Sequence, residues 1–227
     1  MMHDSIRYLF FVLLSLCAFI AMKPVYAVDD SCLLVKNIPE VSSQVIRVHA
    51  TGGFKAEIIA CQRKNGRWTK VFEPSIAVIG KSGLAALGEK KEGDMKTPAG
   101  IYPLGEAFGT QPMALKLDYK YITAEDKFID DVDNSQYNKW VYGATDAKSY
   151  ESMLYDFYKM GIVINYNMNP VVPGAGSAIF MHLWRSADTG TFGCIAMQEA
   201  HLLQLLHWLD KKQHPYVDIY QTTLHGH

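Results

Sequence analysis

The sequence predicts an α+β domain that is rich in β-strands and has a helix late in the chain. Residues 44–63 and 67–79 are predicted strands, and Asn65-Gly66 between them is the strongest short-range signal for a hairpin. Leucines recur at helical spacing over 198–209, which predicts the helix. The apolar alternation of 216–220 predicts a last strand.

The middle of the chain is predicted to be less regular. The segment 80–105 holds six Gly and two Pro, so we expect mostly loop. The segment 118–145 is acidic and aromatic without a clear period, and we expect an ordered lid or wall there. Apolar residues at helical spacing predict a further helix over 146–160. Short buried strands are expected at 162–164 and 177–181.

The composition is that of one ordinary globular domain. The chain has 227 residues, of which 49% are hydrophobic and 20% are charged, which argues against disorder and against a polytopic membrane protein. The net charge of −1 gives no basis for binding nucleic acid, which normally needs a basic excess. We expect a monomer with no nucleic-acid partner.

The N-terminus predicts secretion. Arg7 precedes an uncharged apolar run at 8–22, and Val25-Tyr26-Ala27 has small or short residues at the −3 and −1 positions of a cleavage site. We expect a signal peptide at 1–27, cleaved after Ala27, and no membrane span in the mature form. Retention as an anchor is the alternative, although a spanning helix needs about 20 apolar residues.

The cysteine count becomes informative once the compartment is known. Cleavage removes Cys17 and leaves three cysteines. Cys32 and Cys61 lie close in sequence at the edges of strand-like runs, so we predict that they pair, which would add about 3 kcal/mol in the chain-entropy model. Two free buried thiols are the alternative. Cys194 is then the odd cysteine.

A histidine and a cysteine carry the predicted chemistry. His182 ends a predicted strand, and Cys194 follows Gly193 in a turn that is predicted to lie just before the helix. A thiol attacks as the thiolate, which a nearby imidazole or a helix N-terminus would favour. Backbone N–H groups at the turn could form an oxyanion hole. The alternative is a structural cysteine.

Two separated motifs resemble the L,D-transpeptidase (YkuD-like) catalytic domain family. The stretch 177–210 resembles the family's C-terminal motif, in which a strand histidine precedes Ser/Thr-His-Gly-Cys and a helix. The stretch 92–103 resembles its Gly-Asp-x-x-Thr-Pro-x-Gly-x-Tyr/Phe element. Asn165-Tyr166-Asn167 and 170–182 resemble the branch with His-x-Trp and Thr-x-Gly-Cys. The resemblance covers most of residues 75–220.

The resemblance implies a fold and an organisation. The fold would be a mixed sheet with a helix following the nucleophile. The mature chain, 28–227, would be a single catalytic domain with N-terminal strands at 28–74 and a family-like core at 75–220.

The resemblance also implies residue roles and a reaction. Cys194 would be the acylated nucleophile and His182 the general base. Thr191 matches the position near which a backbone carbonyl orients the histidine, and Gly193 with the Cys194 amide would line the oxyanion hole. The donor would be a peptidoglycan stem tetrapeptide, opened between the diamino acid at position three and the terminal D-Ala. The protein would act in the periplasm.

Some positions depart from the family pattern. Phe192 stands where the family has His, and Ala196 stands where Arg often follows. Arg185 either replaces the lost charge, since a guanidinium suits a carboxylate, or is a solvated surface residue. We assign Trp184 to substrate binding, with core packing as its alternative. Asn165 and Tyr166 are assigned to substrate binding as well.

The leading expectation is a peptidoglycan L,D-transpeptidase that passes its acyl group to an amine. One alternative is an L,D-carboxypeptidase or endopeptidase that uses water on the same scaffold, and another is a non-catalytic wall-binding module. The sequence has no His-Glu-x-x-His and no Cys-x-x-Cys, so we expect no metal and no cofactor. The acidic residues at 126–133 lack calcium-loop spacing and are read as a solvated face or substrate wall.

Overall fold

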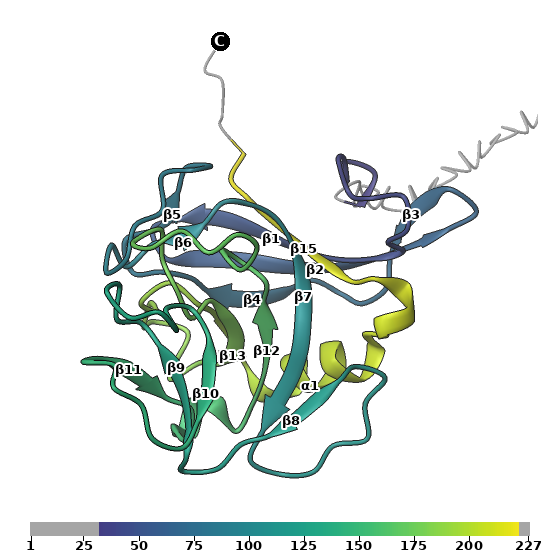
Figure 1. The fold of residues 1–227 in the computed structure, drawn as a ribbon. Helices are drawn as coiled ribbons and strands as arrows, with labels where there is room; N and C mark the ends of the chain where they lie inside the picture. The colour runs from purple at the N-terminus through teal and green to yellow at the C-terminus, as the bar shows by residue number, and fades with distance from the viewer. Residues whose placement is uncertain (1–31, 223–227) are drawn as a thin grey trace, which may run out of the picture.

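Most strands of the protein form one large sheet that closes on itself. The computed structural model describes residues 32–222 (Figure 1), so the predicted signal peptide and Cys17 lie outside the described residues. The strands of this sheet follow the order β1-β15-β7-β12-β13-β14-β4-β2-β3, and an additional pairing of β1 with β2 closes the path. Their bounds are β1 Gln44–Gly52, β2 Lys55–Lys64, β3 Arg67–Lys70, β4 Ser75–Val78, β7 Gly100–Gly109, β12 Met160–Ile164, β13 Phe180–Leu183, β14 Ile195–Met197 and β15 Tyr216–Tyr220.

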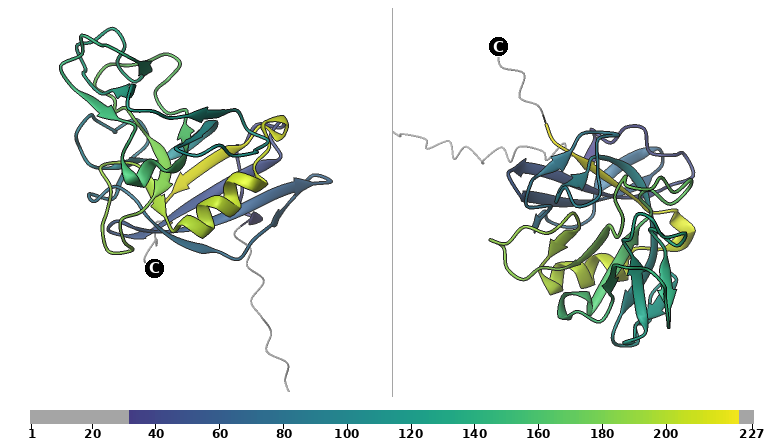
Figure 2. Two further views of the ribbon diagram at one scale, coloured as in Figure 1. Left: turned by 90° about the horizontal axis from the view of Figure 1, so that it is seen from below. Right: turned by 60° about the vertical axis from the view of Figure 1, so that its left-hand side comes forward.

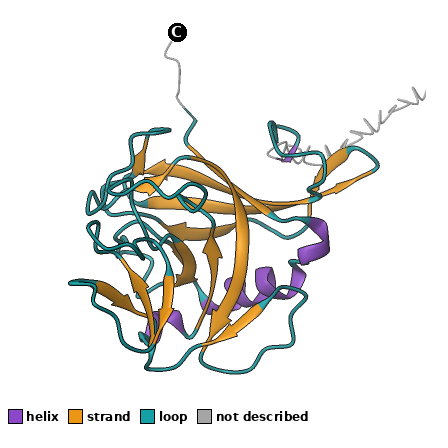
Figure 3. Cartoon of the chain, in the orientation of Figure 1, coloured by secondary structure: helices purple, strands orange, loops and turns teal. Residues whose placement is uncertain are grey.

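The sheet is mixed, as the resemblance implies. β1 pairs with β15, and β13 with β14, in parallel, whereas β7–β12, β12–β13 and β4–β14 are antiparallel. A short strand, β8 (Tyr119–Tyr121), pairs in parallel with β7. Most of the regular secondary structure of the described chain is strand (Figure 3).

The predicted hairpin is confirmed. β2 and β3 pair with Lys64 opposite Arg67, so Asn65 and Gly66 form the two-residue turn. Both have positive φ, 50° and 77°, which matches the turn that fits the twist of a hairpin. The strands predicted over 44–63 and 67–79 correspond to β1, β2, β3 and β4.

The single α-helix of the described residues packs against the larger core. α1 spans Glu199–Trp208, close to the predicted 198–209, and buries Leu202, Leu205 and Leu206. These leucines join Met181, Leu183 and further aliphatic residues of the large sheet. The predicted last strand is confirmed as β15.

A second sheet covers the opposite face of β12, β13 and β14. It has the order β10-β9-β11 and extends to one side of the large sheet (Figure 2). Together with the 3-10 helix η2 (Asp156–Tyr158) it encloses a smaller core, which includes Phe128, Met153, Tyr158, Phe180 and Cys194. The bounds are β9 Asp126–Ile129, β10 Trp140–Tyr142 and β11 Tyr150–Ser152.

The predicted helix over 146–160 is wrong. This segment forms β11, a loop, η2 and the start of β12. Met153 and Tyr158 are buried, whereas Tyr150 and Leu154 are 45% and 48% exposed, so the apolar residues do not share one helical face. Pairing of Tyr150 with Ile129 fixes the segment as a strand instead.

Two segments expected to be irregular contain strands. The segment 118–145 holds β8, β9 and β10, so the predicted ordered wall is partly a sheet. The segment 80–105 is mostly loop, as predicted, with the paired β5 (Leu84–Ala85) and β6 (Thr97–Pro98) and the start of β7. The short strands predicted at 162–164 and 177–181 correspond to β12 and β13.

The predicted disulfide is present. Cys32 and Cys61 are bonded, with a Cα–Cα distance of 5.7 Å, and join the N-terminal segment to β2. Cys194 is a buried free cysteine, as expected for the odd one. Within residues 32–222 no helix is long and apolar enough to cross a membrane.

Candidate active site

The fold places His182 on β13 and Cys194 directly before the neighbouring strand β14. β13 and β14 run parallel with Met181 opposite Ile195, so Cys194 lies beside Phe180 and His182 lies two residues further along. Side chains two residues apart share a face, and this geometry puts the α-carbons of His182 and Cys194 about 8 Å apart. The sheet therefore brings the predicted nucleophile and base into one neighbourhood.

The expected position of Cys194 next to a helix N-terminus is wrong. The residues immediately after Cys194 form β14, and α1 begins only at Glu199. The reason is that Ile195-Ala196-Met197 is fully buried and pairs with β13 and β4. The helix dipole acts within about one turn, so the dipole of α1 does not favour a thiolate at Cys194.

The turn that carries Cys194 is fixed by two threonines. The Thr191 hydroxyl donates to the Cys194 carbonyl at 2.6 Å and accepts from the Gly193 amide at 3.1 Å. Thr97, in the upstream motif, donates to the Gly193 carbonyl at 2.7 Å and accepts from the Gly80 amide at 2.9 Å. Gly193 has a φ of +151° and lies against the Lys96 carbonyl, so a side chain there would be strained.

These bonds change two of the expected roles. The Gly193 amide, expected in the oxyanion hole, points to the Thr191 hydroxyl instead. The Thr191 carbonyl accepts from the Lys81 amide, while His182 Nδ1 lies 2.8 Å from the Leu183 carbonyl. Thr191 thus orders the cysteine turn, and the residue that orients His182 is its own neighbour on β13.

The Cys194 thiol is held as a neutral group. It is 8% exposed, donates to the Ala178 carbonyl at 3.2 Å, and accepts from the Phe180 amide at 3.4 Å. Burial raises the pKa of the thiol far above its ordinary value, and the charge of Glu151 raises it further. The Phe180 amide, the Tyr158 hydroxyl and the charge of Lys90 act in the opposite direction.

His182 is neutral and available as a base. The side chain is buried, and desolvation lowers the pKa of the imidazole to about 4. The Leu183 carbonyl works against this shift, whereas the charge of Arg185 adds to it. A carbonyl at Nδ1 places the proton on that nitrogen and leaves Nε2 as the acceptor. The resting pair is thus a thiol and a neutral imidazole.

Tyr158 touches both members of this pair. Its ring packs edge-on against His182, with centroids 5.0 Å apart, and against Phe180 at 5.6 Å. Its hydroxyl donates to Glu151 Oε1 at 2.6 Å and interacts with the Cys194 thiol. Burial raises the pKa of Glu151 to about 7, despite the bond from Tyr158.

The upstream motif supplies charges next to the cysteine turn. The Lys90 ammonium is buried, pairs with Asp94 at 2.7 Å and donates to the Lys91 carbonyl at 2.7 Å. Burial alone would raise the pKa of Asp94, but the bonds from Lys90, Lys91 and Lys96 outweigh it and lower that pKa. The motif therefore both anchors the turn, through Thr97, and places a buried cation near the thiol.

Glu92, the first residue of the upstream motif, bonds to the loop before β13. Its carboxylate accepts from the Tyr137 hydroxyl at 2.5 Å and from the Ser177 hydroxyl at 2.7 Å. Asn138 bonds to the Ala178 amide and to the carbonyls of Tyr166 and Asn167. These contacts fix the backbone at Ala178, whose carbonyl receives the thiol.

The residues assigned to substrate binding lie in different places. Arg185 is exposed and lies over the Phe157 ring at 5.2 Å, which in turn packs against His182. Trp184 is partly buried and follows His182 by two residues. The Tyr166 hydroxyl donates to the Ala175 carbonyl at 2.5 Å, and its ring packs on Tyr102, which is a structural arrangement.

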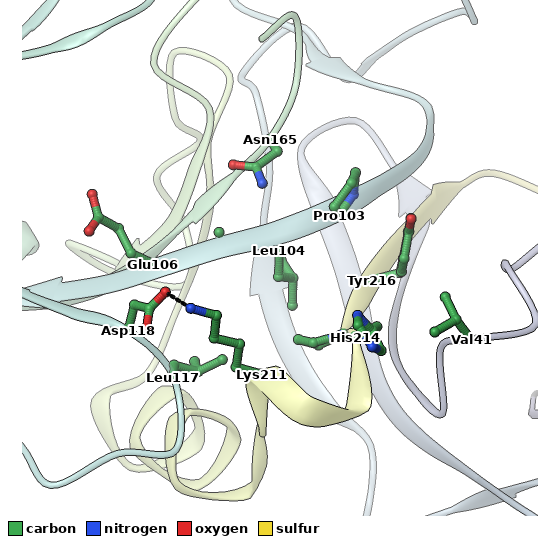
Figure 4. A pocket seen from close by; sticks show the side chains of 12 residues that line it. Val41, Pro103, Leu104, Glu106, Leu117, Asp118, Asn165, Lys211, His214 and Tyr216 are labelled. Carbon is green, nitrogen blue, oxygen red and sulfur yellow. Dashed lines mark hydrogen bonds and ion pairs between the residues drawn. The ribbon is translucent and has the colours of Figure 1, made fainter. Parts of the chain in front are cut away.

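Asn165 lies away from the cysteine, at cavities beside β7. One cavity of about 320 Å³ is lined by Asn165, Glu106, His214 and the ion pair of Lys211 with Asp118 (Figure 4). Another, of about 480 Å³, adjoins Asn165, Trp140 and Phe128. Neither cavity is lined by Cys194 or His182, the predicted nucleophile and base.

Several residues of the site were missed by sequence reasoning. Thr97 belongs to the quoted upstream motif and could have been singled out there. Tyr158 and Glu151 were assigned to a helix that does not form, and Lys90 precedes the motif without a recognisable pattern. Phe192, which departs from the family pattern, is 74% exposed, with Lys81 over its ring at 5.0 Å. The described residues hold no group of three His, Cys, Asp or Glu side chains placed to bind a metal.

The fold and the site define a β-rich domain with a buried histidine on one strand of a mixed sheet and a buried cysteine directly before the neighbouring strand. The family model described as the L,D-transpeptidase catalytic domain (YkuD) matches residues 55–218. The chain therefore belongs to the L,D-transpeptidase catalytic domain family. The matched range begins at the first residue of β2, and so includes part of the N-terminal strands.

Two solved structures match this chain, and both are of the helical cell shape determining protein Pgp2 from Campylobacter jejuni. The K307A mutant gives a TM-score of 0.49 at 16% identity, and the second structure gives 0.44 at 18%. Each comparison covers 80% of this chain and 48% of the Pgp2 chain, so this chain spans about half the length of that protein. No curated protein matches this chain.

Proposed function

We propose that this protein is a periplasmic peptidoglycan L,D-transpeptidase with Cys194 as its nucleophile. The single observation that carries the proposal is the placement of one free cysteine, directly before β14, near a neutral histidine on the neighbouring β13, within a chain of this family. The disulfide between Cys32 and Cys61 agrees with an oxidising compartment.

The proposed reaction proceeds in two balanced steps. In the first, Cys194 Sγ attacks the carbonyl between the diamino acid at position three and the terminal D-Ala, and its proton passes to His182 Nε2. The C–N bond breaks, and D-Ala leaves as an amine with that proton. In the second, an acceptor amine attacks the thioester carbonyl and gives a proton to His182 Nε2. The C–S bond breaks as the new amide forms, and His182 returns the proton to the departing sulfur, which restores the Cys194 thiol.

The resting geometry supports concerted proton transfer. Burial holds His182 neutral near neutral pH and disfavours the thiolate, so no stable ion pair precedes substrate. An incoming carbonyl carbon would accept the developing charge of the sulfur as the imidazole takes the proton. The Phe180 amide, the Tyr158 hydroxyl and the charge of Lys90 favour negative charge at this position.

Purified muropeptides test the proposal. The full secreted protein is incubated with tetrapeptide muropeptides, and cross-linked dimers, tripeptides and released D-Ala are scored by mass spectrometry. Dimers with released D-Ala, absent for Cys194→Ala, are the expected result. Tripeptides without dimers would replace the transferase by an L,D-carboxypeptidase, and binding without any product would indicate a wall-binding module.

A further inference from the structure

Glu151 and Tyr158 lie next to the reactive pair, and the reaction described above does not use them. Glu151 is on β11, and Tyr158 is in η2, so both belong to the small sheet and its connection rather than to the strands that carry Cys194 and His182. The Tyr158 hydroxyl donates to Glu151 at 2.6 Å, and its ring lies against His182 at 5.0 Å. The Tyr158 side chain therefore lies between the Glu151 carboxyl group and the two residues His182 and Cys194.

The hydrogens of Tyr158 and Cys194 have alternative acceptors. In this structure Tyr158 donates to Glu151, and the thiol donates to the Ala178 carbonyl. Tyr158 and Cys194 pack in the same buried cluster, and the Tyr158 hydroxyl lowers the pKa of the thiol. A phenol has one hydrogen, so it can serve the carboxylate or the sulfur, but not both.

We propose that Glu151 and Tyr158 form a positioning pair that controls the Cys194 thiolate through a single proton on Glu151. When Glu151 is protonated, its carboxyl donates to the Tyr158 oxygen, and the Tyr158 hydrogen turns to Cys194 Sγ, where it stabilises the thiolate. When Glu151 is ionised, the Tyr158 hydrogen returns to the carboxylate. The negative charge of Glu151 then disfavours a thiolate at Cys194. We make this proposal on the basis that Cys194 is the nucleophile, as proposed above.

The negative charges around Glu151 favour its protonated form. Burial raises the pKa of Glu151 to about 7, and the charges of Asp130 and Glu92 add to this shift. Asp130 Oδ1 is buried without a hydrogen-bond partner among the described residues. The ionised carboxyl of Glu151 in turn raises the pKa of Cys194. The other titratable or charged groups facing the site are Lys90 from the loop between β5 and β6, His182 from β13, and Arg185 beyond it.

The rate of alkylation of Cys194 as a function of pH tests the proposal. The full protein reacts with iodoacetamide from pH 5 to 10, and peptide mass spectrometry follows Cys194 alone. The logarithm of the rate should rise with unit slope, flatten near pH 7 over about one pH unit, and rise again, because ionisation of Glu151 makes the thiol a weaker acid. His182, with a pKa near 4, does not titrate in this range.

Two variants separate the contributions of the pair. For Glu151→Gln, the logarithm of the alkylation rate should rise with pH as one straight line that extends the low-pH part of the wild-type profile. At pH 9 this variant should react about tenfold faster than wild type. Tyr158→Phe should react more slowly than wild type below pH 7, where the donated hydrogen is lost. In the double variant, the change at Glu151 should have a smaller effect than it has alone.

A second buried tyrosine provides a matched control. Tyr137 donates to Glu92 at 2.5 Å in the same region, and no interaction with Cys194 is shown for it. Tyr137→Phe should lower Tm yet keep the flat region near pH 7.

A straight wild-type profile from pH 5 to 10 overturns the proposal, and this readout needs no variant to fold. A Glu151→Gln profile that still flattens near pH 7 also overturns it. A flat region in a protein that gives no muropeptide product would leave the positioning pair standing and refute the proposed function alone.

Discussion

The two faces of β12, β13 and β14 are built from different chemistry. One face places Met181, Leu183 and Ile195 in the larger core with the leucines of α1. The other face places His182 and Cys194 against Tyr158 and the small sheet, with Glu151 and Lys90 close by. Because side chains alternate along a strand, adjacent residues such as Met181 and His182 belong to different environments. The contrast indicates that one face stabilises the sheet and the other holds the polar groups of the proposed reaction.

Substitution of the two adjacent residues on β13 should give the largest contrast. His182→Ala should slow acylation of Cys194 by about 10²–10⁴-fold, because the proton acceptor is removed. Met181→Ala should lower the free energy of unfolding by about 2–5 kcal/mol through a cavity in the larger core. Chemical denaturation and the rate of acyl-enzyme formation, measured while both variants are folded, check this. Loss of acylation in folded Met181→Ala would break the distinction between the faces.

Thr97 tests the link between the upstream motif and the cysteine turn. Thr97→Val leaves the buried Gly193 carbonyl and Gly80 amide without this hydroxyl, at a cost of about 1–3 kcal/mol in unfolding free energy. We expect acylation to fall as well, by about tenfold, because a turn that supports Cys194 loses a contact. Thr97→Ser keeps the hydroxyl and should retain both properties. Equal acylation rates for Thr97→Val and Thr97→Ser would show that the bond from the Thr97 hydroxyl to the Gly193 carbonyl does not position Cys194.

Glu151 should make stability depend on pH, with the smallest effect of the three. Its folded pKa of about 7 lies above the usual 4.5, so the folded protein holds a proton that the unfolded chain releases between these values. The resulting stability is present in full below about pH 4.5 and is lost as pH rises through 7. Glu151→Gln should therefore match wild type at pH 4 and exceed it by on the order of 1–2 kcal/mol at pH 8. Urea denaturation at the two pH values checks the sign, and a variant less stable than wild type at pH 8 would contradict it.

Local patterns in the sequence predicted the hairpin and the helix, and they singled out His182 and Cys194, which the fold brings into one neighbourhood. Asn65-Gly66 needs only two residues to specify its turn, and the leucines of α1 repeat within one element. His182 and Cys194 are close enough in sequence for a motif to reveal them.

Residues brought together by long-range pairing could not be found in this way. Tyr158 lies near Cys194 because η2 packs on β13, and Glu151 is on β11, which pairs with β9 rather than continuing a helix toward Tyr158. Tertiary pairing overrode the apparent helical spacing of 146–160. The expected helix dipole failed for a similar reason, since β14 occupies the residues after Cys194.

Covalent capture of Cys194 tests the central claim most directly. A carbapenem acylates the nucleophile in the family that this chain belongs to, so intact-mass spectrometry of the wild type after incubation should show one adduct. The Cys194→Ala variant should show none, and peptide mapping should place the adduct on Cys194. No adduct on folded wild type, or an equal adduct on Cys194→Ala, would contradict the assignment of Cys194 as the nucleophile.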